Sequence, residues 1–171
     1  VNRLTKLDVS NNVALKHLDC SDNRLRVEPD LSQNTSLVNL DCKANRLRKL
    51  DVSNNTSLNY LNCEHNQLTR LDLPNEDENA LETLYCSHNQ LTELDVSKNI
   101  DLEHLTCTDN QELAELDLSN NFILQWLYCA RTQLPYDNLE EYKAWSRDQA
   151  RQLKALLDAA MDDLDEEDED D

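Results

Sequence analysis

One eleven-residue pattern occurs six times along the chain, and this repetition sets what the chain can fold into. The pattern reads Leu-x-x-Leu-x-Cys-x-x-Asn-x-Leu. Its copies occupy residues 15–25, 37–47, 58–68, 81–91, 102–113 and 124–134. The fifth copy has one extra residue, and the sixth has Thr132 in place of the asparagine. The leading leucines lie 22, 21, 23, 21 and 22 residues apart, a period typical of stacked repeat architectures.

A second pattern fills the spaces between these copies. It reads Leu-x-x-Leu-Asp-Val-Ser-x-Asn, with small changes, at 4–12, 47–55, 68–76, 91–99 and 113–121, and a weaker version lies at 26–34. In both patterns alternate residues are apolar over a short stretch, as in a strand that buries one face. One coil cannot bury its own leucines, whereas stacked coils pair their strands in parallel and form a continuous core. The repeats therefore predict six stacked coils of about 21 residues.

At these residues the chain resembles bacterial leucine-rich-repeat proteins of the nested 21-residue type, of which internalin-like repeats are close cousins. The resemblance covers residues 4–134. It implies a leucine-rich-repeat solenoid, an α/β-type repeat built mostly from short parallel β-strands. It also implies that asparagines at two opposite corners form buried ladders, whose amides satisfy backbone groups of the turns. These are Asn23, Asn45, Asn66, Asn89 and Asn110 at one corner and Asn12, Asn34, Asn55, Asn99 and Asn121 at the other.

The chain divides into three parts. Residues 1–134 form the solenoid, 135–161 a C-terminal capping helix and 162–171 a disordered acidic tail, in which nine of ten residues are acids. Asp137 and Glu140 resemble a capping box, and apolar residues follow at helical spacing. They are Leu139, Tyr142, Trp145, Ala150, Leu153, Leu157 and Ala160. Residues 74–79 lengthen the fourth coil and should bulge outward.

The first coil has nothing above it to cover Leu4, Leu7 and Val9, so we expect a longer natural chain to precede Val1. No signal peptide is visible, and no apolar stretch is long enough to span a bilayer. If a signal peptide precedes Val1, the protein belongs at the cell surface; otherwise we expect it in the cytoplasm.

Two features of the composition bear on the fold and the partner. The chain has no glycine, so we expect asparagine to take the left-handed turn positions that glycine usually fills.

The formal charge of the chain is −19, from 35 acids against 16 bases. This balance argues against nucleic acid and anionic membranes, which need a basic surface. It favours a basic protein partner that associates in a salt-sensitive way.

The six cysteines share one repeat position, where the family usually has an inward leucine. They are Cys20, Cys42, Cys63, Cys86, Cys107 and Cys129. We expect a column of small buried thiols, because neighbours in a parallel stack point the same way and make poor disulfide geometry. A disulfide or metal role is the alternative. Free thiols in this number favour a reducing compartment.

The sequence gives little indication of a catalytic site or a metal site. The aspartates that recur once per coil could hold calcium if stacked, but local hydrogen bonding is the favoured interpretation. They are Asp8, Asp30, Asp51, Asp72, Asp95 and Asp117. His65 and His88 fall on neighbouring coils, so a transition-metal site there is the weaker alternative. We find no activated nucleophile and no phosphate-binding glycine loop, and we expect neither enzyme activity nor a cofactor.

Positions that vary among the six copies are free for function. On the Leu-x-Cys strands, the outward positions vary most, and the resemblance makes them a concave binding face. Aromatic and histidine side chains gather there on the later coils, and acids on the earlier ones. We expect the partner-binding residues to be Tyr60, Glu64, Tyr85, His104, Trp126, Tyr128, Asp19 and Asp41. The alternative is that the aromatic rings only stack on each other.

These features predict non-enzymatic protein recognition by a protein that is a monomer by itself. A sharper hypothesis is an immunity or inhibitor protein that neutralises a basic toxin or nuclease. The alternative is a structural repeat segment of a surface adhesin or larger scaffold. A basic cluster on the first coils is expected to be a solvated edge, with pairing to nearby acids or to the tail as the alternative. It comprises Arg24, Arg26, Lys43, Arg46, Arg48 and Lys49.

Overall fold

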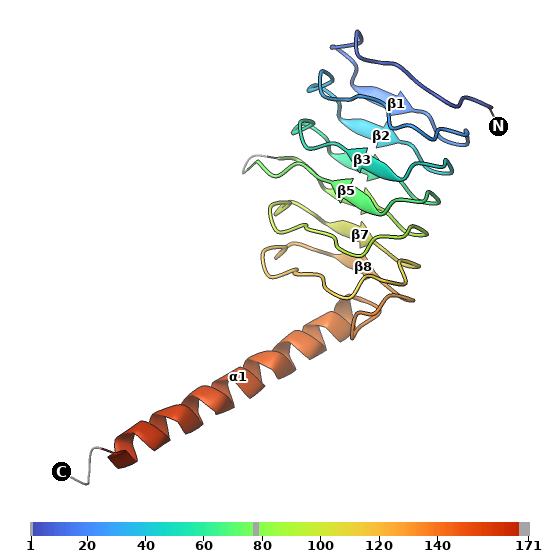
Figure 1. Ribbon diagram of the computed structural model, residues 1–171. Coiled ribbons are helices and arrows are strands. Elements are labelled where there is room, and N and C mark those ends of the chain that lie inside the picture. Colours follow the sequence, from blue (N-terminus) through green and yellow to red (C-terminus); the bar gives the residue numbers. More distant parts are fainter. Residues whose placement is uncertain (1, 77–78, 168–171) are drawn as a thin grey trace.

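The computed structural model describes residues 2–76 and 79–167, with side chains as far as residue 154. Coils stack one upon another and a single helix leaves the last coil (Figure 1). About five turns of parallel solenoid are present, followed by one C-terminal helix. The predicted solenoid is therefore confirmed, including the scarcity of helix before residue 137.

One strand of each coil joins a parallel six-stranded sheet in the order β1-β2-β4-β6-β7-β8. These strands are β1 (His17–Asp19), β2 (Asn39–Asp41), β4 (Tyr60–Asn62), β6 (Thr83–Tyr85), β7 (His104–Thr106) and β8 (Trp126–Tyr128). Each has three residues, with a leucine in the middle that points into the core. The register pairs Leu40 with Leu61 and Leu61 with Leu84, so equivalent repeat positions lie side by side.

The Leu-Asp-Val half of the repeat lies across the core from this sheet. Two of its copies form a second, two-stranded parallel sheet from β3 (Lys49–Asp51) and β5 (Arg70–Asp72). Leu50 of β3 is fully buried, while Lys49 and Asp51 on either side of it are exposed. Both halves of the coil thus contribute inward leucines to one core.

The core is a continuous column of leucine and cysteine. Leu40, Leu61, Leu84 and Leu105 in the strands have no exposed surface, and neither do five of the six thiols. Cys20, in the first coil, is only 4% exposed. Burying a leucine stabilises a fold by about 1.5–3 kcal/mol, so the repeated leucines supply most of the driving force.

The first asparagine ladder is confirmed and links each coil to the preceding one. Asn66 Nδ2 donates to the carbonyl of Cys63 in its own coil at 3.1 Å and to that of Cys42 in the preceding coil at 3.0 Å. Its Oδ1 accepts a hydrogen bond from Leu47 N at 3.0 Å. Thr132 replaces asparagine in the last coil, where its hydroxyl bonds only to its own coil, through Cys129 O and Leu134 N.

The second ladder is also present from Asn34 onward, with one member that the sequence did not predict. Asn12, its predicted first member, is exposed, so the prediction is wrong there. Asn55 Nδ2 donates to Leu31 O and Asn34 O in the preceding coil, and the same pattern recurs at Asn34 and Asn121. In the lengthened fourth coil Asn79 is buried and accepts a hydrogen bond from Asn99 Nδ2 at 2.7 Å. In the segment 74–79, which was expected to bulge outward, Pro74 and Asn79 at the two ends are buried, Asn75 and Glu76 are exposed, and residues 77–78 lie outside the described part.

The left-handed turn positions fall one residue before the first-ladder asparagine, so the expectation that asparagine adopts this conformation is wrong. They are Asp22, Ala44, His65, His88, Asp109 and Arg131, with φ between 52° and 59°. The asparagine side chain is needed inside the turn, where it bonds to three or four backbone groups, so the strained conformation is adopted by the preceding residue. Without glycine, each coil accepts this local cost.

The C-terminal helix α1 (Leu139–Glu167) differs from the expectation in three ways. It extends past 161 into the predicted tail, of which residues 168–171 lie outside the described part. Its cap is Asn138, whose Oδ1 accepts hydrogen bonds from the backbone N–H groups of Glu140 and Glu141. Glu141, instead of Glu140, completes the box by accepting a hydrogen bond from Asp137 N at 2.9 Å.

Among the described side chains of α1, those of the first two turns cover the last coil. Leu139 and Tyr142 pack on the core, and Tyr142 and Trp145 contact the buried ring of Tyr136. Leu153 is 69% exposed, because the helix points away from the stack (Figure 1). The prediction that the whole apolar stripe packs on the coil is therefore wrong for Ala150 and Leu153, and the side chains of Leu157 and Ala160 lie outside those described.

Candidate functional site

The outward side chains of the six-stranded sheet form the surface that the sequence predicted to bind a partner. We call it the sheet face. The parallel register arranges these side chains in two columns that run across the strands. One column contains His17, Asn39, Tyr60, Thr83, His104 and Trp126. The other contains Asp19, Asp41, Asn62, Tyr85, Thr106 and Tyr128.

Two pairs of rings occupy this face. His104 and Trp126 stack with ring centroids 4.4 Å apart and planes within 13°. Tyr60 and Tyr85 meet edge to face at 5.7 Å and 89°. The alternative that rings stack on each other is thus correct in part, since both members of the tyrosine pair are half-buried.

The most exposed aromatic side chains of the sheet face lie on its last strand, β8. Trp126 is 47% exposed and Tyr128 is 54% exposed, and both point outward from β8. The free edge of β8 is covered, because Asn138 bridges to Tyr128 and Cys129 N donates to Asp137 O at 2.9 Å. An edge covered in this way cannot recruit a further strand, so the two exposed rings are available for side-chain contacts.

The three predicted acids lie toward the other end of the sheet and are not brought next to Trp126. Asp19 accepts hydrogen bonds from Ser21, which lower the pKa of its carboxyl group. Asp41 lies 3.8 Å from Lys43 Nζ, but burial raises its pKa. Glu64, nearer the centre, accepts a hydrogen bond from Thr106 Oγ1 at 3.3 Å. The sheet face therefore has an acidic end and an aromatic end.

The cysteine column has the properties of a core, and all six thiols are free. Burial raises the pKa of Cys20 to about 11 and raises those of Cys42, Cys63 and Cys86 as well. A thiol reacts as the thiolate, so these groups are poor nucleophiles in the folded protein.

The aspartate column is held by local hydrogen bonds, as expected. Each of these aspartates except Asp72 accepts hydrogen bonds from the side chain and the backbone N–H of the serine two residues later, and both bonds lower the pKa of the carboxyl group. Asp72 is followed by proline in that position and pairs with Arg70 Nε at 2.8 Å instead. In the described parts of the chain, no three His, Cys, Asp or Glu side chains are placed to hold a metal ion.

His65 and His88 do lie together, with parallel rings 4.2 Å apart. His88 Nδ1 is 3.1 Å from Asp109 Oδ2, and Arg131 Nη2 is 2.6 Å from the same oxygen. His65, His88, Asp109 and Arg131 occupy the left-handed turn positions of four consecutive coils. These residues interact with each other, which accounts for their alignment without a metal ion.

One exposed apolar group was not predicted from the sequence. Phe122 is 86% exposed, and Ile100 and Ile123 are about half exposed. Phe122 and Ile100 share a repeat position, the residue after the second-ladder asparagine, where the second and third coils have threonine. That departure from threonine was visible in the repeats, but it lies outside the strands that the resemblance marked as a binding face.

None of the helices in the described residues is both long and apolar enough to cross a membrane.

Comparison with known proteins gives structural matches only. Neither a protein-family model nor a curated protein matches the chain. The chain is similar to the functional domain of InlJ from Listeria monocytogenes, which is described as including a cysteine ladder. The identity is 32%, with a TM-score of 0.39, over 79% of this chain and 39% of that one.

It is also similar to a leucine-rich-repeat protein from Leptospira interrogans. Here the identity is 25% and the TM-score 0.69, over 78% of this chain and 36% of that one. The chain therefore spans less than half the length of either structure. The Leptospira match extends over most of the repeats, and it carries the comparison of folds.

Proposed function

Because the chain is a leucine-rich-repeat protein, we propose that it binds another protein through the sheet face, without catalysis. The observation that carries this proposal is the exposure of Trp126 and Tyr128, side by side on β8, at 47% and 54%. Exposed aromatic side chains in a group are unfavourable in water and are the usual anchors of protein interfaces. We place the centre of the binding site at these two rings and His104.

The geometry of this centre favours binding. His104 holds the Trp126 ring in a stack, so little side-chain entropy remains to be lost when a partner covers it. Each ring buries a large apolar area on contact. Tyr60 and Tyr85, already half-buried against each other, are expected to contribute less.

The proposed partner is a basic protein, and the sharper form of the proposal is an inhibitor or immunity protein that covers a basic toxin or nuclease. The charge of −19 and the acidic end of the sheet face support this choice. Asp19 and Glu64 have no cation paired with them in the described part of the chain, so both remain available to lysine or arginine. Six unpaired thiols support a reducing compartment such as the cytoplasm.

Affinity capture from the source organism's lysate tests the proposal. We expect the intact chain to retain a basic protein that the double variant Trp126→Ala, Tyr128→Ala loses. Truncating two interface anchors should cost at least about 2 kcal/mol of binding, or about thirtyfold in affinity. Raising the salt concentration should also release the partner, because the association is partly electrostatic.

Phe122→Ala is the matched control, since it removes a more exposed ring from another edge of the same molecule. Circular dichroism should show that all three proteins are folded. If Phe122→Ala loses the partner and the double variant keeps it, the sheet face is not the site. If all three capture the same proteins or none, a structural segment of an adhesin or scaffold becomes the better account.

A further inference from the structure

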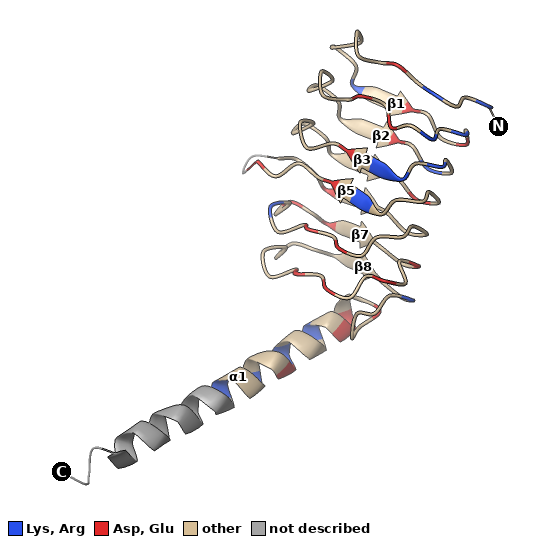
Figure 2. Cartoon of the chain, in the orientation of Figure 1, with Lys and Arg blue, Asp and Glu red and all other residues tan. Residues whose placement is uncertain are grey.

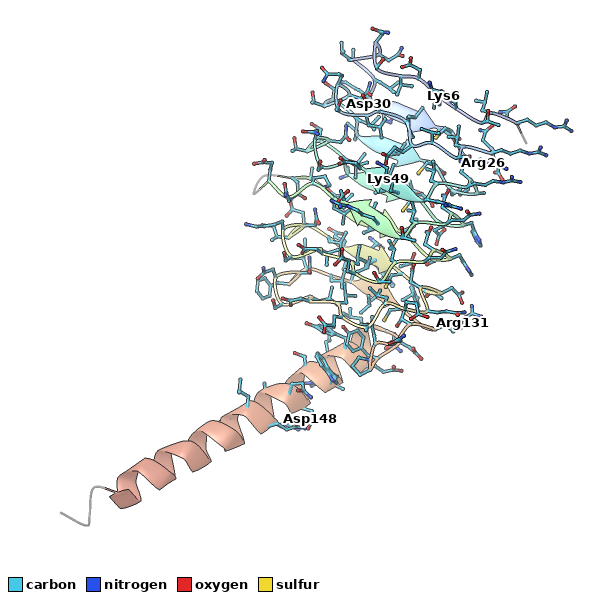
Figure 3. The ribbon with its side chains drawn as sticks, viewed as in Figure 1. Lys6, Arg26, Asp30, Lys49, Arg131 and Asp148 are labelled. Carbon is cyan, nitrogen blue, oxygen red and sulfur yellow. The ribbon has the colours of Figure 1, made fainter. Side chains whose placement is uncertain are left out.

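A cluster of four arginines lies on an edge of the first two complete coils, away from the sheet face. We call it the arginine edge; its members are Arg24, Arg26, Arg46 and Arg48. Backbone hydrogen bonds set their spacing, because Arg24 N donates to Leu4 O and Arg46 N donates to Leu25 O, each at 2.9 Å. The side chains are therefore stacked one coil apart. Figure 2 shows basic segments at this edge near the N-terminal coils, and Arg26 projects outward there in Figure 3.

The repeat itself does not require arginine at these positions. Where the first two coils have Arg24 and Arg46, the next two have Gln67 and Gln90. Where they have Arg26 and Arg48, the next two have Thr69 and Thr92. Glutamine and threonine are thus compatible with the fold at these positions, so the fold does not require the arginines.

The arginine edge is also unneutralised. In the described part of the chain, none of the four guanidinium groups forms an ion pair, whereas the nearby Lys49 pairs with Glu28 at 2.6 Å. Four like charges on neighbouring coils repel each other, so the arrangement is unfavourable without an anion. Arg26, Arg46 and Arg48 line a groove of about 490 Å³ together with Gln67, which is large enough for a row of carboxylates.

The chain also carries an acidic segment whose charge matches the arginine edge. Residues 162–171 hold nine acids. α1 leaves the opposite end of the stack and points away from it, with Asp148 already beyond the last coil (Figures 1 and 3). Residues 162–167, at the far end of α1, are therefore remote from the arginines of the same molecule.

We propose that the arginine edge binds the acidic segment 162–171 of a second copy, so that molecules associate head to tail. Arginine pairs with carboxylates through two parallel hydrogen bonds. The overall negative charge of the two copies opposes this contact weakly at physiological salt, because charges farther apart than about 8 Å are screened. Such a contact joins two different surfaces and does not close on itself, so it extends into short chains of molecules.

Binding of a fluorescent peptide with the sequence of residues 162–171 tests the site, and fluorescence anisotropy is the readout. The variant Arg24→Gln, Arg26→Thr, Arg46→Gln, Arg48→Thr uses the residues of the later coils, so it should fold. We expect it to bind the peptide at least about tenfold more weakly than the intact chain, since four exposed ion pairs are lost. A matched control removes four bases from α1, namely Lys143, Arg147, Arg151 and Lys154, each replaced by glutamine, and should bind the peptide as the intact chain does.

Sedimentation velocity of the unlabelled full chain then tests the second copy. We expect association that grows with concentration, falls with salt and is absent from the arginine variant. Equal peptide binding by the intact chain and the arginine variant would overturn the site. Peptide binding at the arginine edge by a chain that stays monomeric at every concentration would overturn the head-to-tail contact, and the edge would then serve an acidic segment of another protein. The arginine variant leaves Trp126 and Tyr128 untouched, so these results are independent of the partner proposed for the sheet face.

Discussion

Replacing Asn66 with alanine is expected to lower the free energy of unfolding by about 3–5 kcal/mol. The variant leaves the buried N–H of Leu47 without a partner. The carbonyls of Cys42 and Cys63 each lose one hydrogen bond but keep another, from Asn45 and Asn89. A buried group left without a partner costs about 1–3 kcal/mol, and each further lost hydrogen bond costs about 1 kcal/mol. This is a large part of the total stability of a domain, about 5–15 kcal/mol. Urea denaturation of the intact chain and the variant, followed by circular dichroism, measures the difference.

Two other asparagines serve as controls. Asn55→Ala should cost at least about 1 kcal/mol less, because Asn55 Oδ1 has no hydrogen-bond partner in the described structure and its loss strands no N–H group. The carbonyls of Leu31 and Asn34 lose the amide but keep backbone hydrogen bonds from Asn34 N and Leu37 N. Asn54→Ala, at an exposed neighbouring position, should stay within about 0.5 kcal/mol. A cost at Asn66 that is no greater than the cost at Asn55 would show that the first ladder does not hold the coils together.

Raising the pH above about 9 is expected to unfold the protein steeply. Burial raises the pKa of Cys20 to about 11, and the pKa values of Cys42, Cys63, Cys86 and Cys107 are raised as well. In the unfolded chain a thiol has a pKa of about 8.5. Because the folded pKa lies above the unfolded one, the stabilisation is complete below about pH 8.5 and is lost as the pH rises.

The slope of this loss is the measurable quantity. Each thiol that ionises only in the unfolded chain removes about 1.4 kcal/mol per pH unit, so five thiols together remove about 7 kcal/mol per unit. Urea titrations at a series of pH values, with a phosphine reductant present, give the slope. The variant Cys42→Ala, Cys63→Ala should reduce it by about 2.7 kcal/mol per unit. Stability that stays constant between about pH 8 and pH 10 would contradict the buried column of neutral thiols.

The repeat was sufficient to predict most of the solenoid, because each repeat position has one environment that recurs in every coil. Leu40 and Leu61 are inward because alternation places them so, and Asn45 and Asn66 occupy equivalent corners. Features that occur once were harder to predict. The path of α1 depends on how far Tyr136 and Trp145 can cover the last coil, and the role of Asn79 depends on the course of a single longer loop.

The left-handed residues show a different reason for error. Asn66 has the best intrinsic tolerance for that conformation, yet His65 adopts it. The buried amide of Asn66 makes hydrogen bonds that span two coils, and this tertiary requirement outweighs the local preference. The sequence of a single coil shows the local backbone preference of asparagine but not the hydrogen bonds that it makes to the preceding coil.

For the candidate site, the repeats predicted which side chains share the sheet face, but not which rings cover each other and which remain exposed. Tyr60 and Tyr85 lie on adjacent strands in different columns, so their rings meet and cover each other. Trp126 and Tyr128 lie on the last strand, with no further coil beside them, and remain exposed. Which rings are free therefore depends on position in the stack, which the repeated pattern alone does not weigh.

Site-specific photocrosslinking tests recognition through the sheet face most directly. Tyr128 is replaced by the photoreactive residue p-benzoylphenylalanine in one protein and Phe122 in another, which exchanges one aromatic side chain for another in both. Irradiation in the source organism's lysate is followed by mass spectrometry of the crosslinked species. We predict that position 128 crosslinks to a basic protein and that position 122 does not. A crosslink to that protein from position 122, with none from position 128, would contradict recognition through the sheet face.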